Sequence, residues 1–389
     1  MEKKIPILGL ICLLLSSSGC QHSSIAQKPK NIVFVIVDGM GPEQVKAGRI
    51  FAGNKRLSFE SFPHQSTVTT HNIDGEVTDS AAAATAMATG QKVKNRVVSP
   101  GKTLLEYFKE QGKSTGIVTN TLLTDATPAG FAAHAQFRSD TRDILKSYLD
   151  NSQPNLIAGA DEPEYLEQVK ASNAHYKIIQ SSTELKQLQQ DLRSGQKIDH
   201  VYAGFGMHAL IPGEFDRKTA MPLAITSDAF FLSQDIPKIS ETATAALDIL
   251  SQNNKGFFLM VESGLVDWIG HKNTEMSKPM EALSHEMSET NQVVQKISTW
   301  AKSHPDTLVI VTADHETGGL QIDESKTVCL GQEGCVANGK WTSGFYPIYT
   351  EKFSMHTGVK VGVYAMGPGS EAFSMPMDNT EFLRKILGQ

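Results

Sequence analysis

The chain has 389 residues, of which 40% are hydrophobic, and its formal net charge at pH 7 is −6. A chain of this length and composition buries a large core, either as one α/β domain or as two ordinary domains. Binding of nucleic acid without sequence preference needs a basic face, which this net charge does not favour. We therefore expect a globular protein with no nucleic acid as a specific partner.

The N-terminal residues are typical of an export signal. Two lysines precede an apolar stretch from Ile5 to Leu15, and small residues then lead to Cys20. The apolar stretch is too short to act as a stable transmembrane anchor. The residues before Cys20 resemble a bacterial lipobox, although Ser17 stands where that motif usually has leucine. We expect a signal peptide over residues 1–19 and a polar tether over residues 20–30, with either a lipid anchor at Cys20 or cleavage to a soluble periplasmic protein.

Apolar, β-branched runs of strand length alternate with helix-like segments along the rest of the chain. The expected strands are Ile32–Val37, Thr115–Thr119, Phe257–Val261, Leu308–Thr312 and Lys360–Ala365. The expected helices are Thr103–Gln111, Asp140–Leu149, Ser240–Ser251 and Pro279–His304. Continuous apolar strands that alternate with helices favour an α/β fold, a three-layer sandwich with a mostly parallel central sheet and helices on both faces.

Two stretches depart from this alternation. The pattern weakens between Ala160 and Pro237, and the stretch from Lys326 to Tyr349 is rich in glycine and short polar residues. We expect both to be excursions from one domain. The second stretch contains Cys329 and Cys335, which can close a small disulfide loop in an exported protein; two free thiols are the alternative.

Acidic residues stand at the ends of four apolar runs. Asp38 follows the first run, Asp125 the second and Glu262 the third, and the fourth run leads to Asp314 and His315. In parallel sheets, ligands bind beyond the carboxyl ends of the strands. We therefore expect these side chains to gather at one edge of the sheet.

Three histidines accompany these acids in patterns that suit a metal site. Asp267 and His271 are four residues apart, which places both on one face of a helix, where a surface salt bridge is the alternative to a shared metal. Asp314 and His315 precede a glycine-rich turn, where the alternative is a capping aspartate beside an incidental histidine. His356 stands alone before the last strand, and by itself it is more typical of a loop histidine.

Taken together, these residues favour bound cations. Mixed oxygen and imidazole ligation suits zinc, and the number of ligands suits two ions. A further set without nitrogen, formed by Thr127, Glu262 and a shared Asp38, suits magnesium. A non-catalytic protein that binds calcium for stability is an alternative class, but calcium prefers oxygen ligands and leaves the histidines unexplained.

The stretch VTDSAAAATAMATG, from Val77 to Gly90, places an acid and a serine before a run of alanines. Alanine favours helix, and unpaired N–H groups at a helix start bind anions such as phosphate. Ser80 stands at this start, so it is a candidate nucleophile. Asp79 and Ser80 are also favoured N-cap residues, and a purely structural cap is the alternative.

These motifs, in this order, resemble those of the alkaline phosphatase family. The nucleophile motif is matched by TDSAAAATA, and the ligand motifs are matched by VDGMG, LTDATPAGFAAHAQFR, VESGLVDWIGH, TADHETGG and HTG. The motifs extend from residue 32 to about residue 370, so the resemblance covers nearly all of the chain beyond the tether. It implies a catalytic domain of this family over residues 31–389.

The resemblance also implies a role for each residue. A first zinc ion is held by Asp267, His271 and His356. A second zinc ion, beside the nucleophile Ser80, is held by Asp38, Asp314 and His315. Magnesium is held by Asp38, Thr127 and Glu262, with Asp125 binding its waters. Arg138 binds the substrate phosphate bidentately, and Asp79 orients it.

The implied reaction is metal-dependent hydrolysis of phosphate monoesters through a phosphoserine on Ser80. A phosphodiesterase or sulfatase of the same superfamily is the alternative. The resemblance further implies a homodimer, and the N-terminal residues imply export to the periplasm or an outer-membrane lipoprotein of a bacterium. Trp268 stands where some bacterial members have a lysine, which weakens the expected grip on phosphate and makes the identity of the third metal less certain.

Overall fold

The computed structural model describes residues 28–161, 163–206, 215–216, 221–222, 235–273, 276, 278–330, 335–342 and 355–389. The predicted signal peptide, Cys20 and most of the predicted tether lie outside these residues. Among the described residues, none of the helices combines the length and the apolar character needed to cross a bilayer.

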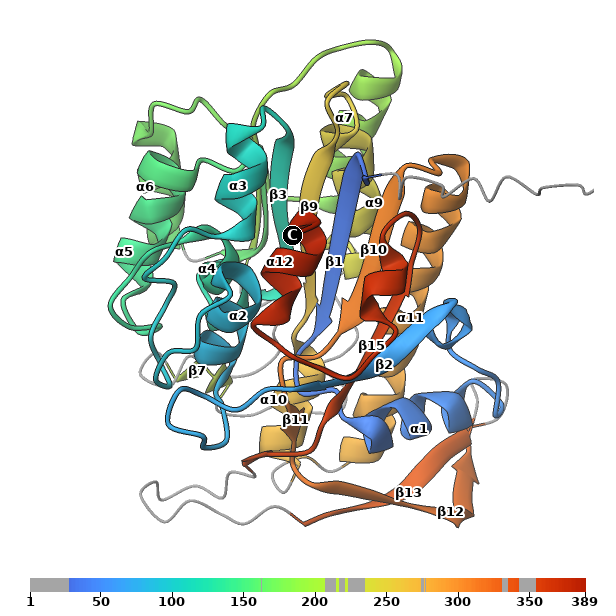
Figure 1. The fold of residues 1–389 in the computed structure, drawn as a ribbon. Helices are drawn as coiled ribbons and strands as arrows, with labels where there is room; N and C mark the ends of the chain where they lie inside the picture. Colours follow the sequence, from blue (N-terminus) through green and yellow to red (C-terminus); the bar gives the residue numbers. More distant parts are fainter. Residues whose placement is uncertain are drawn as a thin grey trace, which may run out of the picture.

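The strand Asn31–Val37 (β1) is buried along its whole length and lies inside the main sheet. Its continuous apolar sequence, NIVFVIV, suits a strand that is covered on both faces. It pairs in parallel with Phe257–Ser263 (β9) on one side and with Thr307–Thr312 (β10) on the other. The carboxyl ends of these three strands therefore open at one edge of the sheet (Figure 1).

The main sheet has ten strands in the spatial order β16-β2-β15-β10-β1-β9-β3-β4-β6-β5. The other seven strands of this sheet are His64–Thr69 (β2), Ser114–Leu122 (β3), Leu156–Asp161 (β4), Lys177–Ile179 (β5), Val201–Gly206 (β6), Val361–Met366 (β15) and Met377–Asp378 (β16). From β10 to β5 every pairing is parallel, whereas β15 runs antiparallel to both β10 and β2. The expected mostly parallel sheet is thus confirmed.

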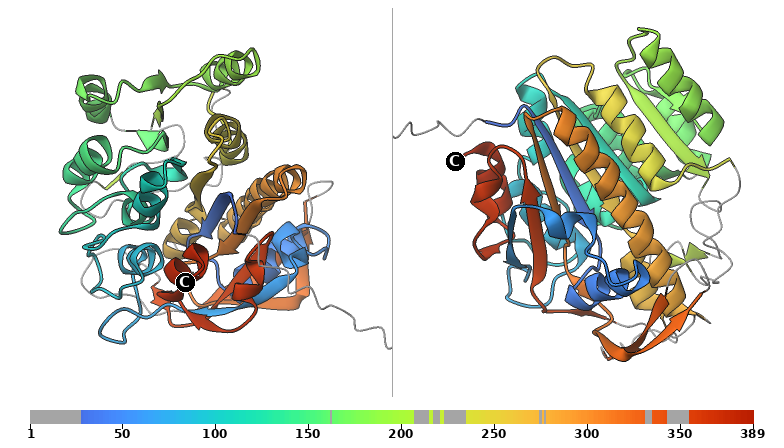
Figure 2. Two further views of the ribbon diagram at one scale, coloured as in Figure 1. Left: turned by 45° about the horizontal axis from the view of Figure 1, so that its top comes forward. Right: turned by 90° about the vertical axis from the view of Figure 1, so that its right-hand side faces the viewer.

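Helices cover both faces of this sheet. The α-helices are Pro42–Phe51 (α1), Ser80–Thr89 (α2), Leu104–Glu110 (α3), Ala126–Ala132 (α4), Thr141–Ser147 (α5), Pro163–Ala171 (α6), Ser182–Arg193 (α7), Ile239–Leu250 (α9), Leu265–Lys272 (α10), Pro279–Ser303 (α11) and Glu381–Leu387 (α12). Shorter helical turns are Ser58–Ser61, Tyr148–Ser152 and Ser370–Phe373. In Figure 2 (right), the yellow and orange helices α9 and α11 lie on one face and the red helix α12 lies on the other.

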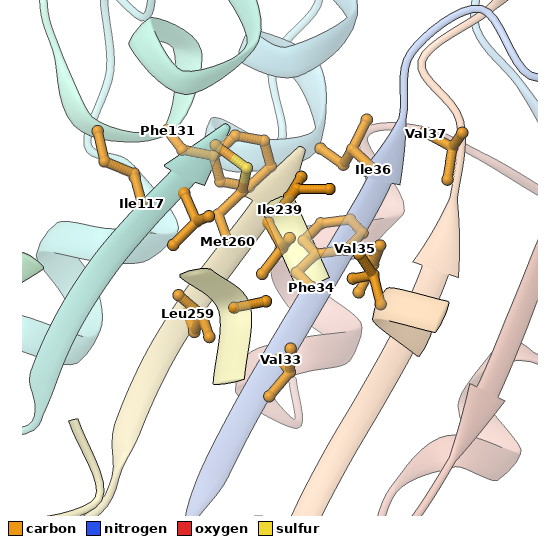
Figure 3. Packing of buried hydrophobic residues seen from close by; sticks show 14 of the residues in the cluster. Val33, Phe34, Val35, Ile36, Val37, Ile117, Phe131, Ile239, Leu259 and Met260 are labelled. Atoms are coloured by element: carbon orange, nitrogen blue, oxygen red, sulfur yellow. The ribbon is translucent and has the colours of Figure 1, made fainter. Parts of the chain in front are cut away.

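Aromatic side chains join the layers. Phe34 of β1 contacts Phe131 of α4 and Phe382 of α12, with ring centroids 5.5 and 4.9 Å apart. On the opposite face, Phe257 of β9 contacts Trp300 of α11 at 5.7 Å. Figure 3 shows Phe34 and Phe131 among the buried apolar side chains around β1. Successive side chains of a strand point to alternate faces of the sheet. The core is therefore a sheet packed between two helical layers, as the sequence predicts.

The expectation for residues between Ala160 and Pro237 is corrected by the structure. Strands β5 and β6 lie in this stretch, and they extend the main sheet instead of leaving it. Their sequence signal is weak because β5 has only three residues and β6, VYAGFG, contains two glycines. Two further short strands, Phe215–Asp216 (β7) and Met221–Pro222 (β8), do form a separate antiparallel pair.

The second stretch forms a hairpin outside the main sheet. Strands Leu320–Cys329 (β12) and Cys335–Trp341 (β13) pair antiparallel, and the predicted disulfide between Cys329 and Cys335 is present. The hairpin contacts α1 and α11 (Figure 1). Two-residue strands, Glu316–Thr317 (β11) and His356–Thr357 (β14), form another separate pair.

The alanine run has a packing reason of its own. All ten residues of α2 are buried, and α2 packs against α4. At the contact, a Cβ added to Gly130 of α4 would lie 2.6 Å from the Cβ of Ala84. Small side chains on α2 and a glycine on α4 therefore allow the two helices to approach closely.

We predict that Gly130→Ala lowers the free energy of unfolding by about 1–3 kcal/mol, because the added methyl group overpacks this contact. Urea denaturation of wild type and variant measures the change. Gly358→Ala is the matched control, because among the described residues its added Cβ meets only Val77 Cγ2, at 4.0 Å. Equal stability of the two variants would contradict the proposed close packing.

Candidate active site

The four predicted strand ends meet at the carboxyl edge of the sheet. Asp38 directly follows β1, Glu262 lies near the end of β9, and Asp314 follows β10. Asp125 follows β3 and caps the next helix, α4, by accepting a hydrogen bond from the Ala126 N–H at 2.6 Å. All four carboxyl groups are buried.

The residues predicted for the first zinc ion converge. Asp267 and His271 lie one turn apart on α10, and His356 comes from β14. The Nε2 atoms of His271 and His356 lie 3.4 and 3.5 Å from Asp267 Oδ1 and 2.9 Å from each other. These three side chains, called here the first ligand group, offer atoms within 4.8 Å of one another, which suits a single ion.

The residues predicted for the second zinc ion lie beside the first ligand group. His315 Nε2 is 3.1 Å from Asp314 Oδ2 and 3.6 Å from Asp38 Oδ1. Asp38, Asp314 and His315 are called here the second ligand group. Asp267 also has an oxygen within 4.8 Å of the ligand atoms of Asp38 and His315, so it lies between the two groups. The geometric cluster around His315 thus contains Asp267, and the place of Asp314 in the second group stays a prediction.

These side chains fit a bound cation. Asp38 Oδ1 and Asp314 Oδ2 are buried, and neither has a hydrogen-bond partner among the described residues. Buried polar atoms are normally paired, so two unpaired carboxylate oxygens beside imidazole nitrogens match the donor set of a metal site. Burial, and then the charge of Asp314, raises the pKa of Asp38 well above its ordinary value. A cation would remove that penalty on the charged form.

The imidazoles already compensate part of the negative charge. Burial alone would raise the pKa of Asp267, but His271 and His356 lower it overall. Burial likewise works against ionisation of Asp314, and His315 lowers its pKa overall.

The third ligand group consists of Asp38, Thr127 and Glu262. The Thr127 hydroxyl donates to Asp38 Oδ2 at 3.2 Å, and its hydrogen bond to Glu262 lowers the pKa of that acid. Burial, and then the Asp125 charge, raise the pKa of Glu262 to about 8 overall. All of these contacts use oxygen, which suits a hard cation such as magnesium.

Two threonines that the sequence analysis did not single out also hold Glu262. Thr119 and Thr121 of β3 both donate to Glu262 Oε2, the second at 3.1 Å. Their spacing of two residues puts both hydroxyls on one face of the strand. The two threonines of TNTLLT, spaced two residues apart, are the sequence feature that could have indicated this contact.

Ser80 is not the capping residue of α2. Asp79 is the N-cap, and its Oδ1 accepts from the Ala82 N–H at 3.0 Å. Ser80 is the first helical residue, and its hydroxyl lies 3.2 Å from His315 Nε2. The capping alternative therefore applies to Asp79 and leaves the Ser80 hydroxyl facing the second ligand group.

Arg138 lies between Asp79 and Asp125. The contact with Asp79 agrees with the prediction that Asp79 orients Arg138. Its Nη1 donates to Asp79 Oδ2 at 3.3 Å and its Nη2 to Asp125 Oδ1 at 3.0 Å. Burial works against the charged guanidinium, but Asp125 and Asp79 raise its pKa overall. The side chain nevertheless keeps 20% of its surface exposed, so an anion from solvent has access to it.

Asp79 also fixes a strained loop residue. Arg96 has a φ of 76°, a left-handed value that non-glycine residues rarely adopt. Its N–H donates to both Asp79 oxygens at 3.1 Å, and its carbonyl accepts from the Arg138 N–H at 2.8 Å. The strain is thus held by the same carboxylate that orients Arg138.

The chain is similar to known proteins along nearly its whole length. The model of the alkaline phosphatase family matches residues 29–159 and 150–352. Alkaline phosphatase 3 of Bacillus subtilis is 28% identical, over 99% of this chain and 96% of its own length. Streptomycin-6-phosphate phosphatase of Streptomyces griseus is 28% identical, over 98% of this chain and 94% of its own.

Solved structures agree on the fold. The alkaline phosphatase of the Antarctic bacterium TAB5 superposes with a TM-score of 0.72 at 24% identity, over 93% of this chain and 98% of its own. The chain therefore belongs to the alkaline phosphatase family, and it is a phosphatase that hydrolyses phosphoesters. Enzymes of this family depend on metal ions, in agreement with the buried ligand groups.

A second buried acid supports the end of β9. Glu286 of α11 accepts hydrogen bonds from Asn120 Nδ2 at 2.8 Å and from the Ser263 hydroxyl at 2.9 Å. Ser263 follows Glu262, and its carbonyl accepts from the Asp38 N–H at 3.0 Å. Burial raises the pKa of Glu286 from 4.5 to about 7. This acid is therefore protonated in the folded protein at mildly acidic pH.

We predict a pH-dependent effect of Glu286→Gln on the free energy of unfolding. The difference between variant and wild type should favour the variant by about 2 kcal/mol more at pH 8 than at pH 5. The folded protein keeps a proton on Glu286 that the unfolded chain releases as pH rises above 4.5, so wild-type stability falls until pH reaches about 7. Glutamine keeps the accepting oxygen and has no proton to lose. Urea denaturation at both pH values in excess EDTA measures the difference.

Glu281→Gln is the control for removing a carboxylate from α11, because Glu281 lies at the start of that helix, 3.1 Å from Lys278, whereas the charge of Glu289 itself raises the pKa of Glu286. A Glu286→Gln variant whose stability relative to wild type is the same at pH 5 and pH 8 would show that Glu286 is ionised in the folded protein throughout that range.

Proposed function

We propose that the enzyme hydrolyses phosphate monoesters through a phosphoserine formed on Ser80. The observation that carries this proposal is the position of the Ser80 hydroxyl, at the start of α2 and 3.2 Å from His315 Nε2 in the second ligand group. A hydroxyl at this place faces both the unpaired N–H groups of a helix start and a cluster of metal-ligating side chains.

We propose zinc for the first and second ligand groups and magnesium for the third. The histidines of the first two groups favour zinc, and the all-oxygen third group favours magnesium. Asp125, which contacts Arg138 and raises the pKa of Glu262, would bind the waters of the third ion. When bound, the ions supply Lewis-acid chemistry, which favours ionised hydroxyl groups and stabilises negative charge on phosphoryl oxygens.

The side chains of the protein then have distinct tasks. The Ser80 oxygen forms a bond to phosphorus while the bond from phosphorus to the alcohol oxygen breaks, and the alcohol leaves. Water later attacks the phosphoserine and releases inorganic phosphate and free Ser80. Arg138, oriented by Asp79 and Asp125, binds two phosphate oxygens in both steps.

Magnitudes decide how this work is divided. Enzymes accelerate phosphate monoester hydrolysis by up to about 10²¹-fold. The positive end of α2 contributes at most about 2 kcal/mol, because helix-dipole effects do not exceed that value. The helix start therefore orients the phosphate, whereas Arg138 and the Lewis-acid centres must supply most of the stabilisation.

The third ligand group supports a monoesterase over a diesterase or sulfatase. By the family resemblance, Thr127 and Glu262 are the ligands that favour monoester hydrolysis. Trp268, buried on α10, stands where some relatives have lysine. We propose that product phosphate is held less tightly without that cation.

Three further expectations stay predictions. Export and lipidation of Cys20 concern residues outside the described part of the chain. The homodimer rests on the family resemblance alone. The division into signal peptide, tether and catalytic domain likewise rests on the sequence.

We predict that Ser80→Ala lowers kcat for p-nitrophenyl phosphate by about 10³-fold or more, because the covalent step needs the serine oxygen. Zinc content should be unchanged, because Ser80 is not among the proposed ligands. Acid quenching with ³²P-labelled monoester should label wild type on Ser80 and leave the variant unlabelled. Unchanged turnover in the variant would refute the nucleophile.

The choice between monoester and diester substrates is tested with the wild-type enzyme. Wild type should cleave p-nitrophenyl phosphate faster than bis-p-nitrophenyl phosphate. A faster rate on the diester would instead identify a phosphodiesterase.

A further inference from the structure

Glu316 is a buried acid that belongs to none of the three ligand groups. It follows His315 and lies in β11, which pairs with β14 so that Glu316 is opposite Thr357 and Thr317 is opposite His356. This two-residue pairing holds His315 and His356 side by side, with ring centroids 3.5 Å apart. Strands this short are not stable alone, so other contacts must hold them.

The Glu316 carboxylate accepts four hydrogen bonds. Its Oε1 accepts from Gln44 Nε2 at 2.8 Å and from the Leu320 N–H at 3.2 Å. Its Oε2 accepts from the Gly319 N–H at 3.2 Å and from the Thr357 hydroxyl. All four donors come from the protein, and together they tie three separate chain segments to one side chain.

Gln44 extends this network to the segment that carries Asp38. Its Oε1 accepts from the Gly41 N–H at 3.1 Å, and its Nε2 also donates to the Thr317 carbonyl at 2.9 Å. A Cβ on Gly41 would lie 2.2 Å from Glu316 Cγ, so this glycine allows the loop after β1 to contact Glu316. The loop after β1 is therefore fixed against β11.

Thr317 connects the network to the ligands themselves. It is fully buried, and its hydroxyl donates to Asp267 Oδ1 and lies 3.2 Å from His315 Nδ1. Its N–H donates to the Gly39 carbonyl at 3.2 Å. One hydroxyl thus contacts a side chain of the first ligand group and one of the second.

We propose that Glu316 is a positioning residue that holds the segments carrying Asp38, His315 and His356 in the arrangement that binds metal. The Glu316 network, defined as Gln44, Glu316, Thr317 and Thr357, includes none of the proposed metal ligands and neither Ser80 nor Arg138. It acts by fixing the angles at which ligating side chains meet an ion, as hydrogen-bonded partners of metal ligands do in general. This inference rests on one part of the proposed function, namely that the ligand groups bind metal ions.

The direct test compares Thr357→Val with Thr357→Ser. Valine matches threonine in shape and removes only the hydroxyl that donates to Glu316 Oε2, whereas serine keeps that donor. We expect Thr357→Val to weaken zinc binding by about 10-fold, the lower end of the range for loss of a direct partner of a metal ligand, because Thr357 acts on the ligands through Glu316. Thr357→Ser should retain the affinity of wild type to within about 3-fold, because the donor is kept.

Zinc affinity is measured by competition with a fluorescent chelator, and the visible spectrum of the cobalt-substituted enzyme reports ligand geometry. The melting temperature of the EDTA-treated protein is the second readout. A positioning role predicts that Thr357→Val shifts this temperature by less than about 4 °C. Glu316→Ala should lower zinc affinity further and change the cobalt spectrum.

Glu43→Ala is the matched control on the neighbouring helix. Glu43 Oε2 accepts from the Ile322 N–H at 2.8 Å, and none of the hydrogen bonds found among the described residues joins its side chain to a side chain of the Glu316 network. Its zinc affinity should equal that of wild type.

The outcomes separate this inference from the proposed function. Wild-type zinc affinity in Thr357→Val and Glu316→Ala would overturn the positioning role, even if monoester hydrolysis is confirmed. Equal weakening by Thr357→Val and Thr357→Ser would also overturn it, because the hydroxyl would then be irrelevant. If wild type lacked monoesterase activity but zinc affinity fell as expected, the proposed function would fail and the positioning role would stand.

Discussion

The structure depends on concentrating buried carboxylates and imidazoles at one edge of a parallel sheet. Asp38, Asp314 and Glu262 are almost fully buried and close enough for their charges to raise one another's pKa, and burial penalises each of their charged forms. The three histidines offset part of this penalty, yet two carboxylate oxygens accept no hydrogen bond from any of the described residues. An arrangement of this kind is costly for an apolar core and suits a protein that binds cations there.

The fold makes this concentration possible through rigid neighbours. The parallel pairing of β1, β9 and β10 brings three acids to one edge, and the buried helix α2 presents Ser80 beside them. Glycine and alanine at the contact between α2 and α4 permit that close approach. The Glu316 network then fixes the loops that the sheet itself does not reach.

Much of this organisation could be predicted from the sequence, because continuous apolar strands that end in acids follow from simple periodicity. The carboxyl-edge position of Asp38 and Glu262 needed no more than that. Other features could not be predicted. Strand β6 contains two glycines and so lacks a clear strand pattern. Asp79 and Ser80 are both suitable N-cap residues, and only the backbone dihedral angles show that Asp79 caps α2. The left-handed Arg96 and the contacts of Glu316 depend on tertiary neighbours that periodicity does not encode.

The central claim is that the first and second ligand groups each hold a transition metal. Anomalous diffraction at the zinc absorption edge, from crystals grown with zinc and magnesium, tests this claim most directly. The account predicts two strong anomalous peaks, one within bonding distance of each of these groups, and none at the third group beside Thr127. A single peak, or peaks bound only by carboxylate oxygens and away from His271 and His315, would contradict it.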